Sequence, residues 1–235
     1  MARALDLACV ILVGGYSSRL PQFKPLLPLG GTTLIEQTVD SVRRAGIAAI
    51  TVVTGHRADE LVPVLARLGV NHVHNAGYAA GMFSSVAAGV GAVAATAAAA
   101  FILPGDMPLI RRHTFRRLAW TFAASGAAVV YPMLNGERGH PPLVARRCFP
   151  AILGGSGPEG LRAVLAGFAA EALEVAVVDE GILCDIDTPA DYEAIKSRLE
   201  NRDIPTAAEC EALLVKLGAP ADVVVHSRAV AAVAD

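Results

Sequence analysis

Apolar runs and glycine-rich breaks alternate along most of the chain. Residues 9–13 are continuously apolar rather than alternating, which is typical of a strand buried on both faces of a parallel sheet. Gly14 and Gly15 end this run sharply. Comparable apolar runs predict further strands at 47–53, 99–103, 127–132 and 172–178, and a short strand is expected at 70–74.

Helical patterns fill the intervals between these strands. The first predicted helix begins at Thr32 or Thr33 and runs to about Arg44, with Glu36 placed to close a capping box on Thr33. Another begins at Thr188-Pro189, as an N-cap followed by a first-turn proline should. The remaining helices are expected at 58–68 with an interruption near Pro63, 82–95, 111–123, 206–217 and 221–234, and a hairpin is expected at 135–144 with its turn at Asn135-Gly136. Strands that alternate with helices predict an α/β fold.

The loop after the first strand carries the groups that a polyphosphate needs. Gly14 and Gly15 leave room for a ligand to approach the main chain. Hydroxyls and cations follow within ten residues, at Ser17, Ser18, Arg19 and Lys24. Several negative charges must be met in a small volume, so this combination predicts a phosphate site. A plain strand-to-helix connection is the alternative.

Two carboxylate-bearing segments lie far from this loop in the sequence. Asp106 follows the strand at 99–103, where a buried carboxylate needs a cationic partner, and beside a phosphate loop Mg2+ suits it. Asp185 and Asp187 are two residues apart, so on an extended backbone they share one face and can reach one cation. All three could instead cap or solvate the helices that follow them.

Several of these stretches resemble one family. The first loop reads G-x-S-x-R-(x4)-K and is similar to the signature loop of the MobA-like molybdenum-cofactor nucleotidyltransferases. Further stretches resemble the same family in the same order. They are N-A-G-Y-A-A-G-M-F-S-S at 75–85, L-P-G-D-M-P-L at 103–109, G-H-P at 139–141, S-G-P-E-G-L-R at 156–162 and D-I-D-T-P-A-D at 185–191. The resemblance covers about 8–197, and the segment 75–85 is most similar to the cytidylyl-transferring, MocA-like branch.

The resemblance implies a three-layer α/β/α fold with a mostly parallel sheet. It also implies transfer of CMP or GMP from a nucleoside triphosphate to a molybdopterin-type cofactor, with release of pyrophosphate. Asp106 and Asp187 would hold Mg2+. Arg19, Lys24 and Asp106 would be the catalytic residues, and His140 and Arg162 would face the acceptor. The expected nucleotide-binding residues are Val13, Gly14, Gly15, Ser17, Ser18, Arg19, Lys24, Gly55, Asn75, Gly81, Met82, Ser84, Ser85, Pro104 and Gly105.

The sequence departs from the family pattern in three places. Leu20-Pro21 stands where the family has Met-Gly, and proline removes an amide donor from the loop. Pro158 replaces an aspartate in the S-G-D-x-G-x-R stretch. Gly14 replaces the alanine of the CTP-using branch. A missing methyl near the base could admit a purine, so position 14 is a candidate for selecting CTP or GTP.

Composition excludes some other classes of function. The chain has 235 residues, 54% of them hydrophobic, and a formal net charge of −2. A nucleic-acid or membrane-surface role driven by bulk charge is therefore not expected. Four widely spaced cysteines without a C-x-x-C pair predict reduced thiols in a cytoplasmic protein. The expected partners are the small-molecule substrates, together with an acceptor molybdoenzyme or its chaperone.

The composition changes near residue 200. We predict a nucleotidyltransferase domain at 1–199 and a linker with a helical tail at 200–235. The stretch from Ile204-Pro205 to His226 resembles the opening of an HD-type phosphohydrolase domain, but the chain contains no His-Asp dipeptide. The tail is accordingly expected to be either a truncated HD domain or a helical appendage.

Two other functions are compatible with the same residues. The acceptor could be a sugar phosphate or an alcohol phosphate, with the fold and the transfer unchanged. The chain could also be a non-catalytic nucleotide-binding module, an alternative that the loop departures at Pro21 and Pro158 support.

Overall fold

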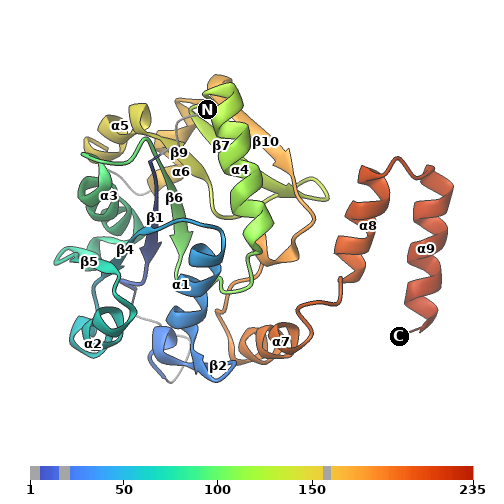
Figure 1. Ribbon diagram of the computed structural model, residues 1–235, viewed down its shortest axis with the longest axis horizontal. Helices are drawn as coiled ribbons and strands as arrows, with labels where there is room; N and C mark the ends of the chain where they lie inside the picture. The colour runs from blue at the N-terminus through green and yellow to red at the C-terminus, as the bar shows by residue number, and fades with distance from the viewer. Residues whose placement is uncertain (1–5, 16–21, 156–159, 235) are drawn as a thin grey trace.

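The computed structural model describes residues 6–15, 22–155 and 160–234, and its centre is a mixed β-sheet (Figure 1). The strand order is β10-β7-β9-β6-β1-β4-β5, with β8 paired to β7. These strands are β1 Leu7–Leu12, β4 Ala49–Thr54, β5 Asn71–His74, β6 Ala99–Pro104, β7 Val129–Leu134, β8 Glu137–Arg138, β9 Leu143–Ala145 and β10 Ala172–Ala176.

The sheet consists of two parallel blocks. β1 pairs in parallel with both β4 and β6, and β4 pairs in parallel with β5. β7 pairs in parallel with β10. The short strand β9 lies between the blocks, antiparallel to β6 and to β7. β6 and β7 therefore run in the same direction, and the strands of both blocks end at one edge.

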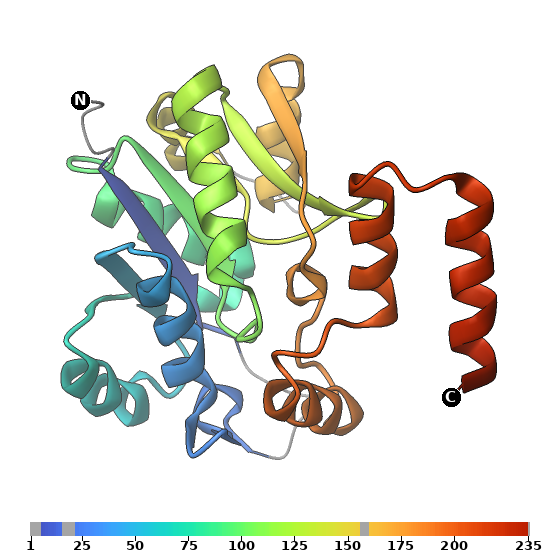
Figure 2. The same ribbon diagram turned by 45° about the vertical axis from the view of Figure 1, so that its right-hand side comes forward.

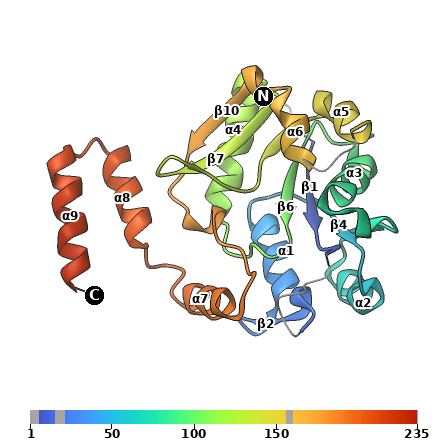
Figure 3. The ribbon, with the colours of Figure 1, turned by 180° about the vertical axis from the view of Figure 1, so that it is seen from behind.

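Helices cover both faces of the sheet. α1 (Leu34–Arg44) and α4 (Arg112–Ser125) contact each other on the face turned toward the viewer in Figure 1. α3 (Met82–Val93), α5 (Phe149–Leu153) and α6 (Gly160–Ala166) pack together on the opposite face, seen from behind in Figure 3. α2 (Ala58–Leu68) lies against β4 and β5. The three-layer α/β/α prediction is confirmed.

Continuous apolar strands form the core, as the sequence pattern indicates. Cys9, Val10 and Ile11 of β1 are fully buried, and so is Phe101 of β6, which makes an edge-on ring contact with Phe115 of α4. Desolvation raises the pKa of the Cys9 thiol far above its usual range, so this cysteine is an inert core residue.

Most predicted elements are present within a few residues of their expected ends. The capping box at the start of α1 is confirmed, because the Thr33 side chain pairs with the Glu36 backbone and the Thr33 amide donates to the Glu36 carboxylate at 2.8 Å. The interruption predicted near Pro63 is wrong, since α2 runs through it. Pro63 lies in the second turn of α2, so its missing N–H removes one hydrogen bond close to the N-terminus of the helix.

Other short elements carried no clear sequence signal. β2 (Pro28–Leu29) and β3 (Thr32–Thr33) form a small antiparallel ribbon directly after the single-turn helix Lys24–Leu26.

The predicted hairpin turn at Asn135-Gly136 is confirmed, with both residues at positive φ and with β8 pairing back onto β7. The peptide bond between His140 and Pro141 is cis.

The C-terminal helices form a pair beside the domain (Figure 2). α7 (Pro189–Glu200) leads to α8 (Ala207–Lys216), whose Ala208 and Ala212 pack against the main core. α9 (Ala221–Ala234) packs against α8, and most of its described side chains are exposed. The domain boundary at residue 200 and the relation to an HD domain stay predictions. None of the described helices combines the length and the apolar character needed to cross a membrane.

Candidate active site

Loops from four neighbouring strands meet at the carboxyl edge of the sheet. Gly14 follows β1, Gly55 follows β4, Asn75 follows β5 and Asp106 follows β6. Gly14 and Gly55 pack backbone to backbone, because a Cβ added to Gly55 would lie 2.7 Å from the Gly14 carbonyl oxygen. The His56 amide also donates to that carbonyl, at 3.3 Å. Position 55 therefore requires a glycine, and the loops after β1 and β4 pack directly against each other.

A buried amide organises the loop between β5 and α3. Asn75 Nδ2 donates to the Ser84 and Ser85 hydroxyls, at 2.8 and 3.0 Å, while Asn75 Oδ1 accepts the Gly77 amide at 3.0 Å. Ser84 and Ser85 belong to the first turn of α3, so Asn75 joins the β5 loop to a helix N-terminus. The predicted residues Gly14, Gly55, Asn75, Ser84 and Ser85 are thus brought together.

The distant carboxylates also converge. Lys24 Nζ lies 2.8 Å from Asp106 Oδ2 and 3.1 Å from Asp187 Oδ1. Asp106, Asp185 and Asp187 each offer an oxygen within 4.8 Å of the others. Such a set of carboxylate oxygens suits a hard divalent cation such as Mg2+ or Mn2+. The structure therefore adds Asp185 to the predicted pair of metal ligands.

A small second core lies beneath these charged groups. It contains Leu27, three residues after Lys24, Leu109, three residues after Asp106, and Ile186, which separates Asp185 from Asp187. Leu29, Leu34 and Ile195 complete it. Ile186 is fully buried, which stabilises the segment by about 2 kcal/mol and turns the flanking carboxylates toward the site.

The electrostatics of the cluster follow from this crowding. Burial acts to lower the pKa of Lys24, but the hydrogen bonds and charges of Asp106 and Asp187 outweigh it and raise the pKa. Desolvation raises the pKa of Asp185, and repulsion from Asp106 and Asp187 adds to the effect. The three carboxylates thus repel one another and favour any cation that enters among them.

The candidate acceptor residues lie in different places. His140 belongs to the segment between β8 and β9, and its pKa is lowered by desolvation, while the charges of Asp106 and Asp185 act to raise it. Its amide donates to Ile182, 2.9 Å away, so it lies near the carboxylate segment. Arg162 instead lines a separate cavity of about 420 Å³ with Tyr131 and Arg138. The role of Arg162 at the acceptor stays a prediction.

Some predicted positions need separate mention. Ser17, Ser18, Arg19, Pro21 and Pro158 lie outside the described residues. Val13 is buried and Pro104 is half-buried, and their roles in nucleotide binding stay predictions. Gly15, Gly81 and Met82 lie at the open edge, and Met82 is 68% exposed.

The sequence did not reveal Glu209, the carboxylate that connects helix α8 of the C-terminal tail to the region of the site. Glu209 is a buried carboxylate on α8 that contacts Arg111 and Arg198. The pattern Thr206-x-x-Glu209 is a capping box, and the structure confirms one there. That local signal agrees with the predicted start of the helix at Thr206, but it could not have revealed the distant arginines.

Known proteins match both the sequence and the fold. The family described as the MobA-like NTP transferase domain matches residues 9–175. The molybdenum cofactor cytidylyltransferase of Escherichia coli is 32% identical over 191 residues, which are 81% of this chain and 95% of that protein. A molybdenum cofactor guanylyltransferase of Xanthomonas euvesicatoria is 39% identical over 102 residues, 43% of this chain and 47% of that protein.

A solved structure supports the same assignment. A nucleotidyl transferase from Methanothermobacter superposes with a TM-score of 0.72 and 26% identity, covering 83% of this chain and 98% of that one. The fold is that of nucleotidyltransferases. The chain belongs to the MobA-like NTP transferase family.

Proposed function

We propose that this enzyme transfers CMP from CTP to the phosphate of a molybdopterin-type cofactor and releases pyrophosphate. The carrying observation is the convergence of Lys24 with Asp106 and Asp187 at the strand edge, in a chain that aligns with 95% of a cytidylyltransferase. The guanylyltransferase relative aligns over 47% of its length, so GTP is the second candidate nucleotide.

The transfer needs position and charge more than covalent help from the protein. An acceptor phosphate is already ionised at neutral pH, so no general base is required, and in-line attack on the α-phosphorus brings two anions together. Lys24 would balance the charge of the triphosphate and of the departing pyrophosphate. Arg19 is proposed for the same task.

A divalent cation fits the residues present. Asp106, Asp185 and Asp187 would hold it through oxygen atoms, which are the ligands that Mg2+ prefers. When bound, it would supply positive charge against the phosphate oxygens. The chain's own residues would do the rest. Asn75, Ser84 and Ser85 would shape the nucleoside side, and His140 would face the acceptor from the carboxylate side.

A panel of nucleotides tests this function. The purified protein is incubated with CTP, GTP or ATP, with Mg2+ and with metal-free or molybdenum-loaded molybdopterin, and pyrophosphate is measured. We expect release with CTP and molybdopterin, and a loss of at least about 100-fold in Asp106→Asn. The exposed Asp222→Asn on α9 is the control and should behave as wild type. Equal turnover of Asp106→Asn and wild type would refute the site, and release with sugar phosphates but not molybdopterin would refute the acceptor.

A further inference from the structure

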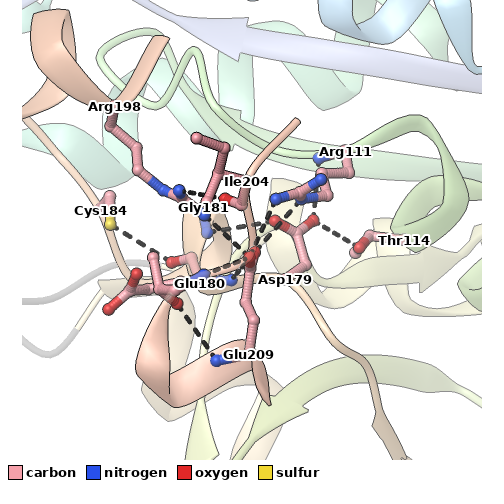
Figure 4. Close-up of polar contacts among 10 residues, drawn as sticks. Arg111, Thr114, Asp179, Glu180, Gly181, Cys184, Arg198, Ile204 and Glu209 are labelled. Atoms are coloured by element: carbon pink, nitrogen blue, oxygen red, sulfur yellow. Dashed lines mark hydrogen bonds and ion pairs between the residues drawn. The ribbon is translucent and has the colours of Figure 1, made fainter. Parts of the chain in front are cut away.

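A second polar cluster, drawn in Figure 4, shares no residue with the proposed metal site. Three distant segments meet there. They are the start of α4, the stretch 179–184, and α7 with α8. At its centre is Glu209, only 1% exposed, on a helix beyond the residues that the family matches.

Glu209 is fully engaged. Its Oε1 accepts from Arg111 Nε at 3.2 Å and from the Glu180 amide at 3.1 Å. Its Oε2 accepts from Arg111 Nη2 at 2.9 Å, from Arg198 Nη2 at 2.8 Å and from the Thr206 amide at 3.1 Å. Buried charges are retained only where such partners satisfy them.

These partners flank the three carboxylates of the site. Glu180 precedes Asp185 by five residues, and Arg198 lies on α7, which begins two residues after Asp187. Glu209 therefore contacts the chain on both sides of the stretch 185–187. Arg111 follows Asp106 by five residues, so the same carboxylate also holds the other metal-binding segment.

A second carboxylate strengthens the same connection. Asp179 Oδ2 accepts the Arg111 amide at 2.8 Å and the Thr114 hydroxyl at 2.5 Å, and Oδ1 accepts the Gly181 amide at 3.1 Å. The backbones meet closely here, because a Cβ added to Gly181 would lie 2.7 Å from the Leu109 carbonyl. The segments that carry Asp106 and Asp185 are thus in direct contact behind the site.

We propose that Glu209 is a positioning residue for the metal site, which means that the tail helix α8 sets the spacing of Asp106 against Asp185 and Asp187. This inference rests on the proposed function. Glu209 is not one of the three carboxylates that would hold the cation. Without its charge, the guanidinium groups of Arg111, Arg198 and Arg202 would surround the single carboxylate of Asp179, and the stretch 185–187 would lose these contacts on both sides.

Two measurements on Glu209→Gln test the proposal in the full chain. Hydrogen exchange reports the order of the amides at 105–111 and 180–188, and electron paramagnetic resonance reports the binding of Mn2+ alone. We expect faster exchange in both segments and a Kd for Mn2+ raised about 10-fold, the scale seen when support of metal ligands is removed. The matched control is Glu211→Gln on the same helix, which loses an exposed ion pair with Arg228 and should leave both measurements unchanged.

Each outcome decides between a structural and a positioning role. Unchanged exchange at 105–111 and 180–188 overturns the proposal, and so does faster exchange with an unchanged Kd, because Glu209 would then only stabilise the fold. A wild type that binds no Mn2+ overturns the proposed metal site, and this inference with it, and is recognised because it appears before any substitution. If Glu209→Gln does not fold, Arg198→Gln, which removes one of the two arginine partners, should show the same changes at smaller size.

Discussion

Lys24 offers a sharp test, because it should affect metal binding and turnover in opposite directions. Its ammonium group holds Asp106 and Asp187, the same carboxylates that we propose as metal ligands. A cation that binds there must displace or share those hydrogen bonds. Lys24→Met keeps an apolar side chain of similar length and removes the competing charge.

The size of the competition can be worked out from the contacts. A hydrogen bond between charged groups contributes about 1.5–3 kcal/mol. The bond to Asp106 is largely shielded, whereas the Asp187 side chain is 44% exposed and its bond counts for less. A total of about 2 kcal/mol corresponds to a factor of about 30 in affinity. We therefore expect Lys24→Met to bind Mn2+ roughly 30-fold more tightly.

Turnover should fall in the same variant. The triphosphate would lose a positive charge directed at it, and the loss of one such electrostatic contact costs about 100- to 1,000-fold in kcat. Pyrophosphate release is measured at saturating CTP, and Mn2+ affinity by electron paramagnetic resonance. Lys196→Met, which removes an exposed ion pair with Glu193 and a cation–π contact with the Tyr192 ring, is the matched control. Unchanged Mn2+ affinity together with normal turnover would refute the reasoning.

Three further predictions concern other parts of the molecule. Gly14→Ala should change the ratio of kcat/KM for CTP and GTP, because its Cβ would lie 3.0 Å from Ser85 Oγ; an unmoved ratio would exclude position 14 from base selection. Gly89→Ala should destabilise the fold by about 2 kcal/mol in a denaturant titration, since its Cβ would lie 2.2 Å from Val10 Cγ1. Glu209→Gln should lower the free energy of unfolding by about 3 kcal/mol at pH 7. Burial acts to raise the pKa of Glu209, but the amides and arginines around it lower that pKa below the usual 4.5. The ionised Glu209 side chain therefore contributes its full stabilisation of the fold above pH 4.5. The Tm difference from wild type should shrink as the pH falls through the folded-state pKa; a difference that stays constant in acid would contradict this.

Local patterns predicted much of the fold. The strand 9–13 and the capping box of α1 depend on neighbouring residues, so the sequence reveals them. The meeting of Lys24, Asp106 and Asp187 could also be anticipated, because parallel strands place their loops at one edge.

Other features depend on long-range contacts that no local pattern contains. β9 is only three residues long, and its place between β6 and β7 is set by pairing with strands elsewhere in the chain. The role of Glu209 depends on where α8 packs, since Arg111 lies 98 residues away in the sequence. Asp185 could be grouped with Asp187 from their spacing, but its proximity to Asp106 required the fold.

The two parallel blocks have a consequence for how the protein reaches its native state. The strands of one block come from residues 7–104 and those of the other from 129–176, so each can form from a continuous stretch of chain. They join through the short ladder between β6 and β9. Lys24 lies within the first stretch and Asp106 follows it by two residues, whereas Asp185 and Asp187 follow the second. A folding intermediate with one block formed would thus lack a complete carboxylate cluster, and recovery of activity on refolding should follow the docking of the two halves.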